Sequence, residues 1–367
     1  MCHLNPPTPQ SPSPALAHPP PESQPDPPPG FDWLAAIGAR IGSDGLPDFG
    51  DRRAEAAAAL NTDVIAPLAD RGTIRVRGAD RDAFLQGQLS SDLRELTPSR
   101  GQLASYSTPK GRVLAIFTAI RSGDDIWLET SRSLLAPTLK RLRMFVMRSK
   151  VTLDDAGADV ISVGVAGPNA DRVLEAAGLV VPSVLCLCGA VDGVVVMRRR
   201  GPQNRYSLHG SAERFAALWP KLAAQARPVG TEAWRLTDIL AGFPALHPET
   251  SEQHVAQMMN LDQLDGVSFT KGCYPGQEIV ARLHYLGNLK RRMYIARSPV
   301  ADIVRGAAVV LAGGDGQSEA QTVGDVLDVA LHPDGGSALL VVLQTSQQEA
   351  TTLCVGTADG PALSLLR

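Results

Sequence analysis

The sequence predicts an α+β protein: two related α+β units, each an antiparallel sheet with helices on one face, followed by a small all-β domain. Two stretches share the order strand, glycine turn, helix, and two more share the order strand, amphipathic helix. After about residue 290, short strand-like segments recur between clusters of Gly, Pro and Asp, which indicates a small barrel or sandwich. The length of 367 residues suits two or three domains.

The paired segments define the two α+β units. "TIRVRGADRDAFLQGQL" (73–89) and "SVGVAGPNADRVLEAAGL" (162–179) each predict a strand, a turn and a helix. "DDIWLETSRSLLAPTLKRLRMFV" (124–146) and "NRYSLHGSAERFAALWPKLAA" (204–224) each predict a strand and an amphipathic helix. Neither glycine turn has the G-x-G-x-x-G spacing, which argues against a dinucleotide-binding fold.

These patterns suggest four segments. Residues 1–30 hold 12 of the 28 prolines and are expected to form a disordered tail, because they cannot bury an apolar core. We predict that the first α+β unit spans 31–160 and that the second spans 161–290. Residues 291–367 are then the C-terminal all-β domain.

Composition excludes several classes of protein. The net charge is −3, so we expect neither a general nucleic-acid partner nor direct membrane attachment, and no apolar run is long enough to span a bilayer. The five cysteines are dispersed, which indicates a reducing compartment, the cytoplasm, rather than a disulfide framework. No C-x-x-C pair is present, so we predict no metal site.

The stretch "KGCYPGQE" (271–278) is the strongest candidate for chemistry. Pro275 suits the start of a helix, so Cys273 is expected just before a helix N-terminus. The helix dipole and Lys271 would then both stabilise a thiolate at Cys273. The alternative is a tight structural loop that contains an incidental cysteine. A pairing of Cys273 with His284 is a further, weaker possibility.

This loop lies within "DGVSFTKGCYPGQEIVARLHYLGNLKRRMY" (265–294), which resembles the YgfZ-type folate-binding proteins, relatives of the glycine-cleavage T-protein aminomethyltransferase. "FLQGQLSSDL" (84–93), "STPKGRVL" (107–114), "FVMRSKV" (145–151), "AGFPAL" (241–246) and "MMNLDQL" (258–264) support the resemblance. It covers roughly residues 60–365. It implies three domains in a ring around a channel that holds tetrahydrofolate or a derivative, with a C-terminal β-barrel.

The resemblance also implies the site residues. Cys273 and Lys271 would carry any chemistry of the loop. The residues expected to contact the folate are Gln86, Gln88, Asp92, Lys110, Trp234, Asn260, Tyr274, Gly276, Gln277 and Glu278. Trp234 is the candidate for stacking on the pterin, although its amphipathic window suits a core position equally well.

Three departures from the family pattern bear on function. Leu240 stands where some relatives carry a glutamate, and Arg71 stands where some carry an aromatic residue. T-proteins use an acidic residue on the strand after their glycine turn, whereas the matching strand here, "GRVLAIF" (111–117), has none. One-carbon transfer would therefore lack its catalytic carboxylate.

The resemblance implies a folate-binding accessory protein that supports iron–sulfur cluster assembly or repair, including the clusters of tRNA-modifying enzymes. Its partners would be a reduced folate and iron–sulfur client proteins or assembly factors. Whether it is an enzyme is left open, and the alternative is a folate-dependent aminomethyl or one-carbon transferase. A thiol redox or metal-relay module centred on Cys273 is the third hypothesis.

Overall fold

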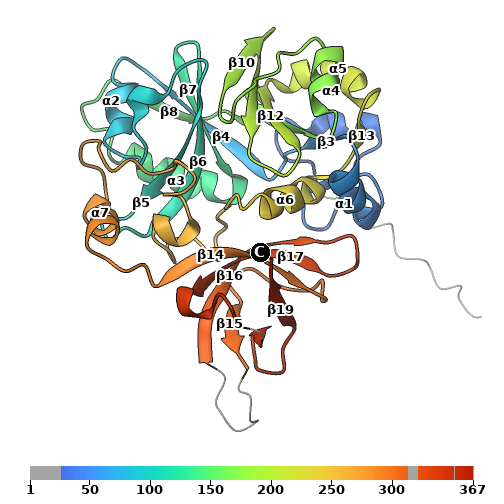
Figure 1. The fold of residues 1–367 in the computed structure, drawn as a ribbon. Coiled ribbons are helices and arrows are strands. Elements are labelled where there is room, and N and C mark those ends of the chain that lie inside the picture. The colour runs from blue at the N-terminus through green and yellow to red at the C-terminus, as the bar shows by residue number, and fades with distance from the viewer. Residues whose placement is uncertain (1–25, 313–320, 351, 367) are drawn as a thin grey trace, which may run out of the picture.

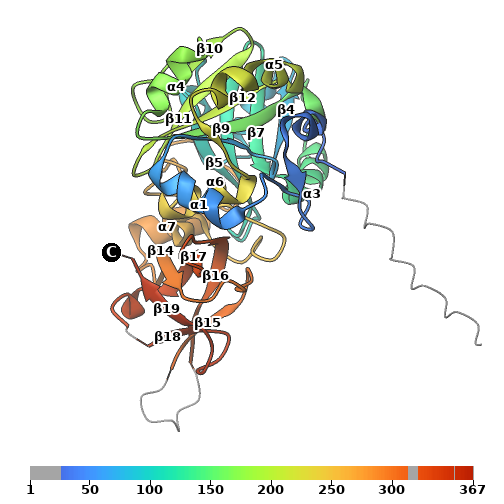
Figure 2. The same cartoon turned by 90° about the vertical axis from the view of Figure 1, so that its right-hand side faces the viewer.

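Two α+β units lie side by side above a β-barrel in the computed structural model, which describes residues 26–312, 321–350 and 352–366. A view from the side shows the barrel beneath both units (Figure 2). Most of the segment predicted to be a disordered tail, residues 1–25, lies outside the described residues. Phe31 is fully buried, so the packed structure begins by that residue.

The first unit is a five-stranded antiparallel sheet with helices α2 (Arg81–Gln86) and α3 (Arg132–Arg143). In sheet order its strands are β5 (Gln102–Ser107), β6 (Val113–Ser122), β7 (Asp125–Ser131), β4 (Arg71–Arg77) and β8 (Thr152–Asp155). Leu135, Leu139 and Leu142 recur at helical spacing along α3 and bury one face of that helix against the sheet. Both strand–helix pairs predicted for this unit are confirmed.

The second unit is a six-stranded sheet with helices α4 (Ala170–Ala176) and α5 (Ala212–Ala223). In sheet order its strands are β10 (Cys188–Val191), β11 (Val194–Arg199), β12 (Asn204–Gly210), β9 (Ile161–Gly167), β3 (Val64–Pro67) and β13 (Arg227–Pro228). All neighbours are antiparallel except β3 and β13. The two strand–helix pairs expected here are also present.

The N-terminal segment belongs to the second unit rather than the first. Strand β3 pairs with β9, with Ile65 opposite Val165. Phe31 and Leu34, from the 3-10 helix η1 (Asp32–Ile37) and its N-cap, lie in the core of the second unit. The sheet of the first unit therefore begins only at Arg71, not near residue 31. The short turn between β3 and β4 carries the chain from one sheet to the other.

The remaining elements connect the units. Helix α1 (Arg52–Asn61) is capped by Asp51, whose side chain accepts a hydrogen bond from Ala54 N. Helix α6 (Thr231–Leu240) is buried along almost its whole length and packs on α1, β3 and the barrel. The others are α7 (Gln277–Tyr285), the strand pair β1 (Arg40–Ile41) and β2 (Pro47–Asp48), and the 3-10 turns η2 (Leu93–Glu95), η3 (Gly157–Asp159), η4 (Ala256–Met259) and η5 (Thr345–Gln347).

The C-terminal domain is a closed barrel, as predicted. Its strands follow the order β14 (Arg291–Ser298), β17 (Ser337–Gln344), β16 (Gln321–Leu331), β15 (Ala308–Leu311), β18 (Leu353–Val355) and β19 (Ala362–Leu365). Pairing of Ala296 with Leu365 closes the ring. Leu327, Leu340 and Val342 point out of the barrel core and join a second apolar cluster with α6, which fixes the barrel to the units above it.

Candidate functional site

Two glycine turns pack closely against each other where the KGCYPGQE loop leads into helix α7. Gly276, with φ of +83°, precedes α7. A Cβ on Gly276 would lie 2.6 Å from the Cα of Gly111 and 2.7 Å from the carbonyl oxygen of Thr108. Gly111 itself has φ of +74°, and a Cβ there would lie 3.0 Å from Ile279. The loop and the K-G turn of the first unit therefore fit together only if both positions are glycine.

Lys271 is an internal anchor. Its side chain is 5% exposed, and its ammonium donates to the carbonyl oxygens of Gln86 at 2.6 Å, Leu89 at 2.6 Å and Ser91 at 2.8 Å. Burial lowers the pKa of Lys271 to about 8. All three protons of the ammonium are thus engaged by carbonyls at the end of α2 and just after it. We expected this charge to stabilise a thiolate at Cys273, and the structure directs it into the first unit instead.

Gln86, Gln88 and Asp92, which we expected to contact the folate, lie at the end of α2 and in the segment that follows it. Gln86 donates from Nε2 to Asp92 at 3.1 Å and accepts from Leu93 N at 2.7 Å. Hydrogen bonds from Arg94 hold the pKa of Asp92 well below its usual range. Gln88 is half-buried, and its Oε1 has no hydrogen-bond partner among the described residues. The side chains of Gln86 and Asp92 therefore stabilise the turn that Lys271 caps.

The structure gathers only part of the predicted set around the loop. Tyr274 is buried, its ring centroid lies 5.2 Å from the Lys271 ammonium, and burial raises its pKa to about 12. Gln277 donates to the Lys271 carbonyl at 3.3 Å. Lys110 and Glu278 are exposed. Asn260, with φ of +57°, instead donates to the Met293 carbonyl at 2.9 Å, between η4 and the barrel.

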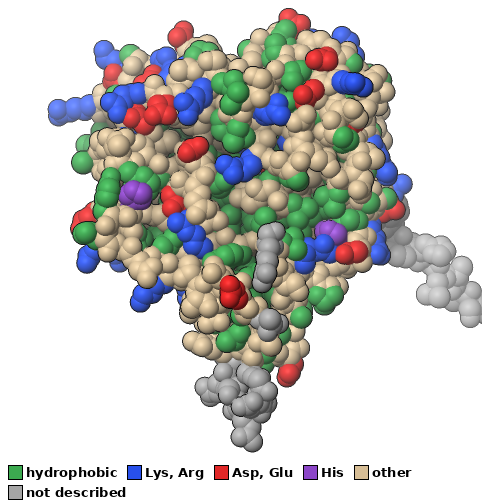
Figure 3. Space-filling view, in the orientation of Figure 1, with side chains coloured by type: hydrophobic (Ala, Val, Ile, Leu, Met, Phe, Trp, Pro, Cys, Tyr) green, Lys and Arg blue, Asp and Glu red, His purple; other side chains and the backbone are tan. Residues whose placement is uncertain are grey.

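Cys273 is an exposed free thiol. The hydrogen bonds among the described residues include none between Cys273 and His284. The His284 ring instead stacks on Phe269, with centroids 3.7 Å apart and planes at 15°. Figure 3 shows a histidine next to hydrophobic side chains on the face over α7.

Trp234 is a core residue of the second unit. It is 2% exposed, and one ring face lies so close to β9 that a Cβ on Gly164 would be 2.3 Å from it. The guanidinium carbon of Arg205 lies 4.5 Å from the ring centroid. Gly164 and Arg205 thus lie against the indole, which leaves little room for a stacked pterin.

A charged pocket that the sequence did not predict lies where the three units meet. Its volume is about 550 Å³, within the usual range for small-molecule sites. Charged side chains from five segments line it: Asp44 between β1 and β2, Asp70 before β4, Arg132 at the start of α3, Glu232 and Arg235 on α6, and Arg305 of the barrel domain. His247 beyond α6 also lines it.

Three guanidinium groups and three carboxylates line this pocket, and two of the carboxylates, Asp44 and Glu232, pair with Arg52 at 2.8 and 3.3 Å. Arg235 donates to Asp70 Oδ2 at 2.9 Å, whereas Asp70 Oδ1 accepts no hydrogen bond from the described residues. Burial raises the pKa of Asp70, but the neighbouring Arg71 and Arg235 guanidinium groups outweigh it, so the pKa lies below its ordinary value. Asp70 is therefore a carboxylate held between two guanidinium groups, with its buried Oδ1 3.5 Å from Arg71 Nε.

The other polar groups of the pocket differ in how fully they are paired. Arg305 donates to Asp328 at 2.7 Å, and His247 Nε2 lies 3.4 Å from the same oxygen. Arg132 donates to the Ala69 carbonyl at 3.1 Å and forms no ion pair within the described ranges. Burial lowers the pKa of Arg132, because its charge is only partly compensated. Arg132 is thus the guanidinium most available to a ligand.

One feature of the sequence could have indicated that charged groups from distant segments meet near α6. Arg235 and Asp238 are charged residues three positions apart in "TEAWRLTDIL", an otherwise buried helix. Asp238 accepts from Arg71 at 2.8 Å and from Arg205 at 2.5 Å. Charges on a buried helix face call for partners elsewhere in the chain.

A second cavity lies between the two sheets, next to Phe243. Thr118 of β6 and Met197 of β11 line it, and the Arg199 guanidinium carbon lies 4.4 Å from the Phe243 centroid. Its volume of about 40 Å³ holds a few water molecules, not a pterin.

The described residues contain neither a candidate metal site nor a membrane-spanning helix. No group of three His, Cys, Asp or Glu side chains is placed to hold a metal ion. Within the same ranges, every helix is too short or too polar to span a bilayer.

Comparison with known proteins agrees with this architecture. No family model matches the chain. Three relatives are each named tRNA-modifying protein YgfZ. The protein from Colwellia psychrerythraea is 33% identical over 232 residues, 63% of this chain and 70% of the relative. That from Hamiltonella defensa is 35% identical over 228 residues, 62% and 68% of the two chains. That from Yersinia pestis is 33% identical over 227 residues, 62% and 68%.

A solved structure shares the fold. The glycine cleavage system aminomethyltransferase T of Bartonella henselae superposes with a TM-score of 0.73 at 15% identity, over 92% of this chain and 96% of the other. The three-domain T-protein architecture is therefore confirmed. With the identity to the three relatives over more than two thirds of their length, the chain belongs to the YgfZ family.

Proposed function

We propose that this protein is a cytoplasmic folate-binding accessory factor that supports iron–sulfur cluster assembly or repair, including the clusters of tRNA-modifying enzymes. Membership of the YgfZ family and the T-protein fold support this proposal. The observation that carries the folate part is the 550 Å³ pocket between the three units, which combines the Asp70 carboxylate with several guanidinium groups.

The residues of this pocket fit the chemistry of a folate. A pterin presents adjacent N–H donors on its edge, which the Asp70 carboxylate in the pocket wall would accept. The glutamate end of a folate carries carboxylates, which Arg132 and Arg305 would bind by charge-assisted hydrogen bonds. Arg71, at the position of an aromatic residue in some relatives, donates to Asp238 at 2.8 Å and contributes charge rather than a stacking surface. Bound tetrahydrofolate would supply a carrier for one-carbon units.

The strand after the K-G turn argues for an accessory role rather than one-carbon transfer. Strand β6 reads "VLAIFTAIRS" and contains no acidic residue. Glu129 on the neighbouring strand lies opposite Thr118, but it is buried and accepts a hydrogen bond from Ser162. An aminomethyltransferase remains the alternative, and an assay with tetrahydrofolate and an aminomethylated carrier protein separates the two. We expect no turnover above the uncatalysed rate; robust turnover would favour the transferase.

Folate binding is tested by calorimetric titration of tetrahydrofolate into the full-length protein and into Arg132→Gln. We expect affinity to fall about tenfold or more, because a charge-assisted hydrogen bond contributes about 1.5–3 kcal/mol. Arg227→Gln, an exposed arginine on β13, is the matched control and should bind like the parent protein. No binding by the parent protein, or equal binding by both variants, would refute the proposed site.

The accessory role needs a separate measurement in cells. In a strain that lacks this gene, a cluster-dependent tRNA-modifying enzyme should lose activity, and a metal-independent one should not. Complementation with Arg132→Gln should restore less activity than the parent gene. Equal activity of the cluster-dependent enzyme with and without the gene would contradict the accessory role, even if folate binds.

A further inference from the structure

A basic surface follows helix α3 in a protein of net negative charge. Residues 140–150, "KRLRMFVMRSK", carry five Lys or Arg residues and no acidic residue, while the whole chain has a net charge of −3. Lys140, Arg143, Arg148 and Lys150 are all exposed. Only Arg143 has an acidic partner among the described residues, Asp154 at 3.4 Å. Three uncompensated cations therefore face solvent within eleven residues.

The same segment exposes large apolar side chains. Met144 is 63% exposed, Phe145 45% and Met147 88%. The segment is nevertheless anchored: Val146 packs against the core of the first unit, and Lys150 N donates to Asp80 at 2.7 Å. Exposed apolar side chains between cations in a fixed loop indicate a binding surface rather than a solvated end of a helix.

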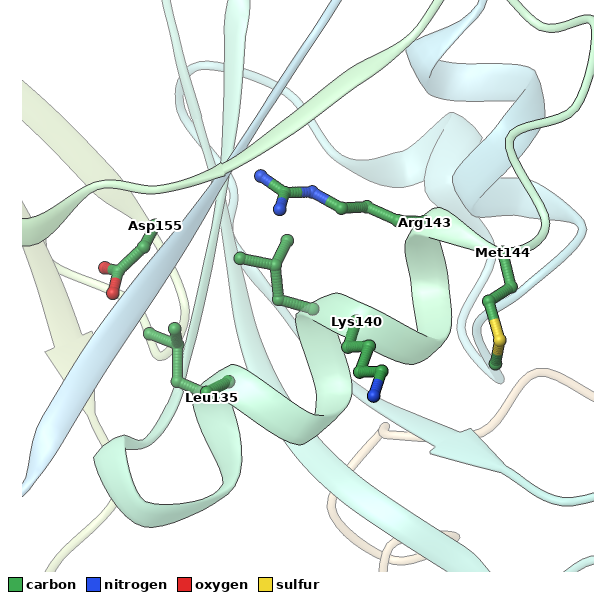
Figure 4. Close-up of a pocket in the computed structure, with 7 residues that line it drawn as sticks. Leu135, Lys140, Arg143, Met144 and Asp155 are labelled. Atoms are coloured by element: carbon green, nitrogen blue, oxygen red, sulfur yellow. The ribbon is translucent and has the colours of Figure 1, made fainter.

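A shallow hollow of about 480 Å³ adjoins this surface. Its wall is apolar where Leu135 and Leu139 line it, and Lys140, Arg143 and Met144 lie at its edge. Figure 4 shows Asp155 on the strand side of the hollow and the three edge residues along the end of α3. Asp155 Oδ1 accepts from Gly157 N at 2.9 Å, and its second oxygen accepts no hydrogen bond from the described residues.

We propose that residues 140–150 and the adjoining hollow bind RNA at unpaired nucleotides. The exposed cations Lys140, Arg148 and Lys150 would contact phosphates, and the apolar wall with Met144 and Phe145 would contact a base. The free oxygen of Asp155 would accept from an exocyclic amino group of that base.

The alternatives fit this surface less well. An anionic membrane would bind to the cations and to the exposed Met and Phe residues, but its lipids would make no favourable contact with a hollow that contains a carboxylate. Duplex RNA offers phosphates but no base that can enter the hollow. The inference goes beyond the proposed function, since folate binding and cluster support require no contact with RNA. The test of RNA binding is therefore independent of the tests of folate binding and of cluster support.

Fluorescence anisotropy with a labelled 12-nucleotide single-stranded RNA tests the inference on the full chain. The double variant Lys140→Glu/Arg148→Glu should weaken binding at least tenfold. It should also lower the slope of log affinity against log salt by about 0.7 for each lost phosphate contact. The matched control, Arg172→Glu/Lys221→Glu, makes the same charge change at exposed positions on α4 and α5 and should have a much smaller effect.

The apolar contribution is tested by Phe145→Ala/Met147→Ala, which leaves the charge unchanged and removes exposed side chains. We expect weaker single-strand binding with an unchanged salt slope, and a 4-thiouridine crosslink in the peptide 140–150 of the parent protein. Equal loss in the charge control, stronger binding of a blunt 12-base-pair duplex, or binding only to phosphatidylserine vesicles would each overturn the inference.

Discussion

Replacing Lys271 with methionine should destabilise the protein by about 3 kcal/mol. The substitution keeps the apolar stem but removes the ammonium that donates to Gln86, Leu89 and Ser91 at 2.6 to 2.8 Å. Each buried carbonyl that loses its donor costs about 1–3 kcal/mol. Part of this loss is offset, because the folded protein no longer buries a charge whose pKa is lowered to about 8.

The loss of these hydrogen bonds should loosen mainly the segment that supplies the three carbonyls. A method that reports on single peptides can therefore detect it even if the whole protein does not unfold in one step. Hydrogen exchange followed by mass spectrometry should show faster exchange in the peptide that covers residues 84–94. Urea denaturation gives the change in stability. Lys110→Met is the matched control, because Lys110 is exposed, and it should change stability by less than about 0.5 kcal/mol. Unchanged exchange at 84–94 in Lys271→Met would show that the three hydrogen bonds do not hold this segment.

Three further predictions concern buried and exposed groups. Burial lowers the pKa of His209 from 6.5 to about 4, so between these pH values the unfolded chain takes up a proton at this residue and the folded protein does not. The free energy of unfolding should therefore fall by about 3 kcal/mol as the pH drops from 6.5 to 4. Urea denaturation should show a smaller fall for His209→Gln. Trp234→Ala should cost about 3–5 kcal/mol in the same assay, and a loss below about 1 kcal/mol would contradict its core position. Brief iodoacetamide treatment at pH 8 should modify Cys273 before Cys188, whose pKa burial raises to about 11; peptide mass spectrometry that showed the opposite order would contradict this.

Periodicity in the sequence was sufficient to predict the local elements. Segments such as 124–146 and 204–224 change from strand to helical spacing at one point, and the structure changes there too. The repeated order of these pairs indicated two units, and the short, evenly spaced strands after residue 290 indicated the barrel. Each of these features depends on neighbours in the chain.

Contacts between distant segments were not predictable in this way. Strand β3 reads like any buried strand, and nothing within it specifies pairing with β9 about 100 residues later. Lys271 was placed beside Cys273 because the two are close in sequence, whereas its hydrogen-bond partners lie about 180 residues earlier. The charged pocket draws Asp70, Arg132, Arg235 and other charged residues from five segments, so no local spacing could reveal it.

A crystal structure of the full-length protein with tetrahydrofolate would test folate binding most directly. We predict electron density for the folate in the pocket between the three units, with the pterin edge at Asp70 and a carboxylate near Arg132. Density beside Phe243 instead, or none at saturating tetrahydrofolate, would contradict the proposed site.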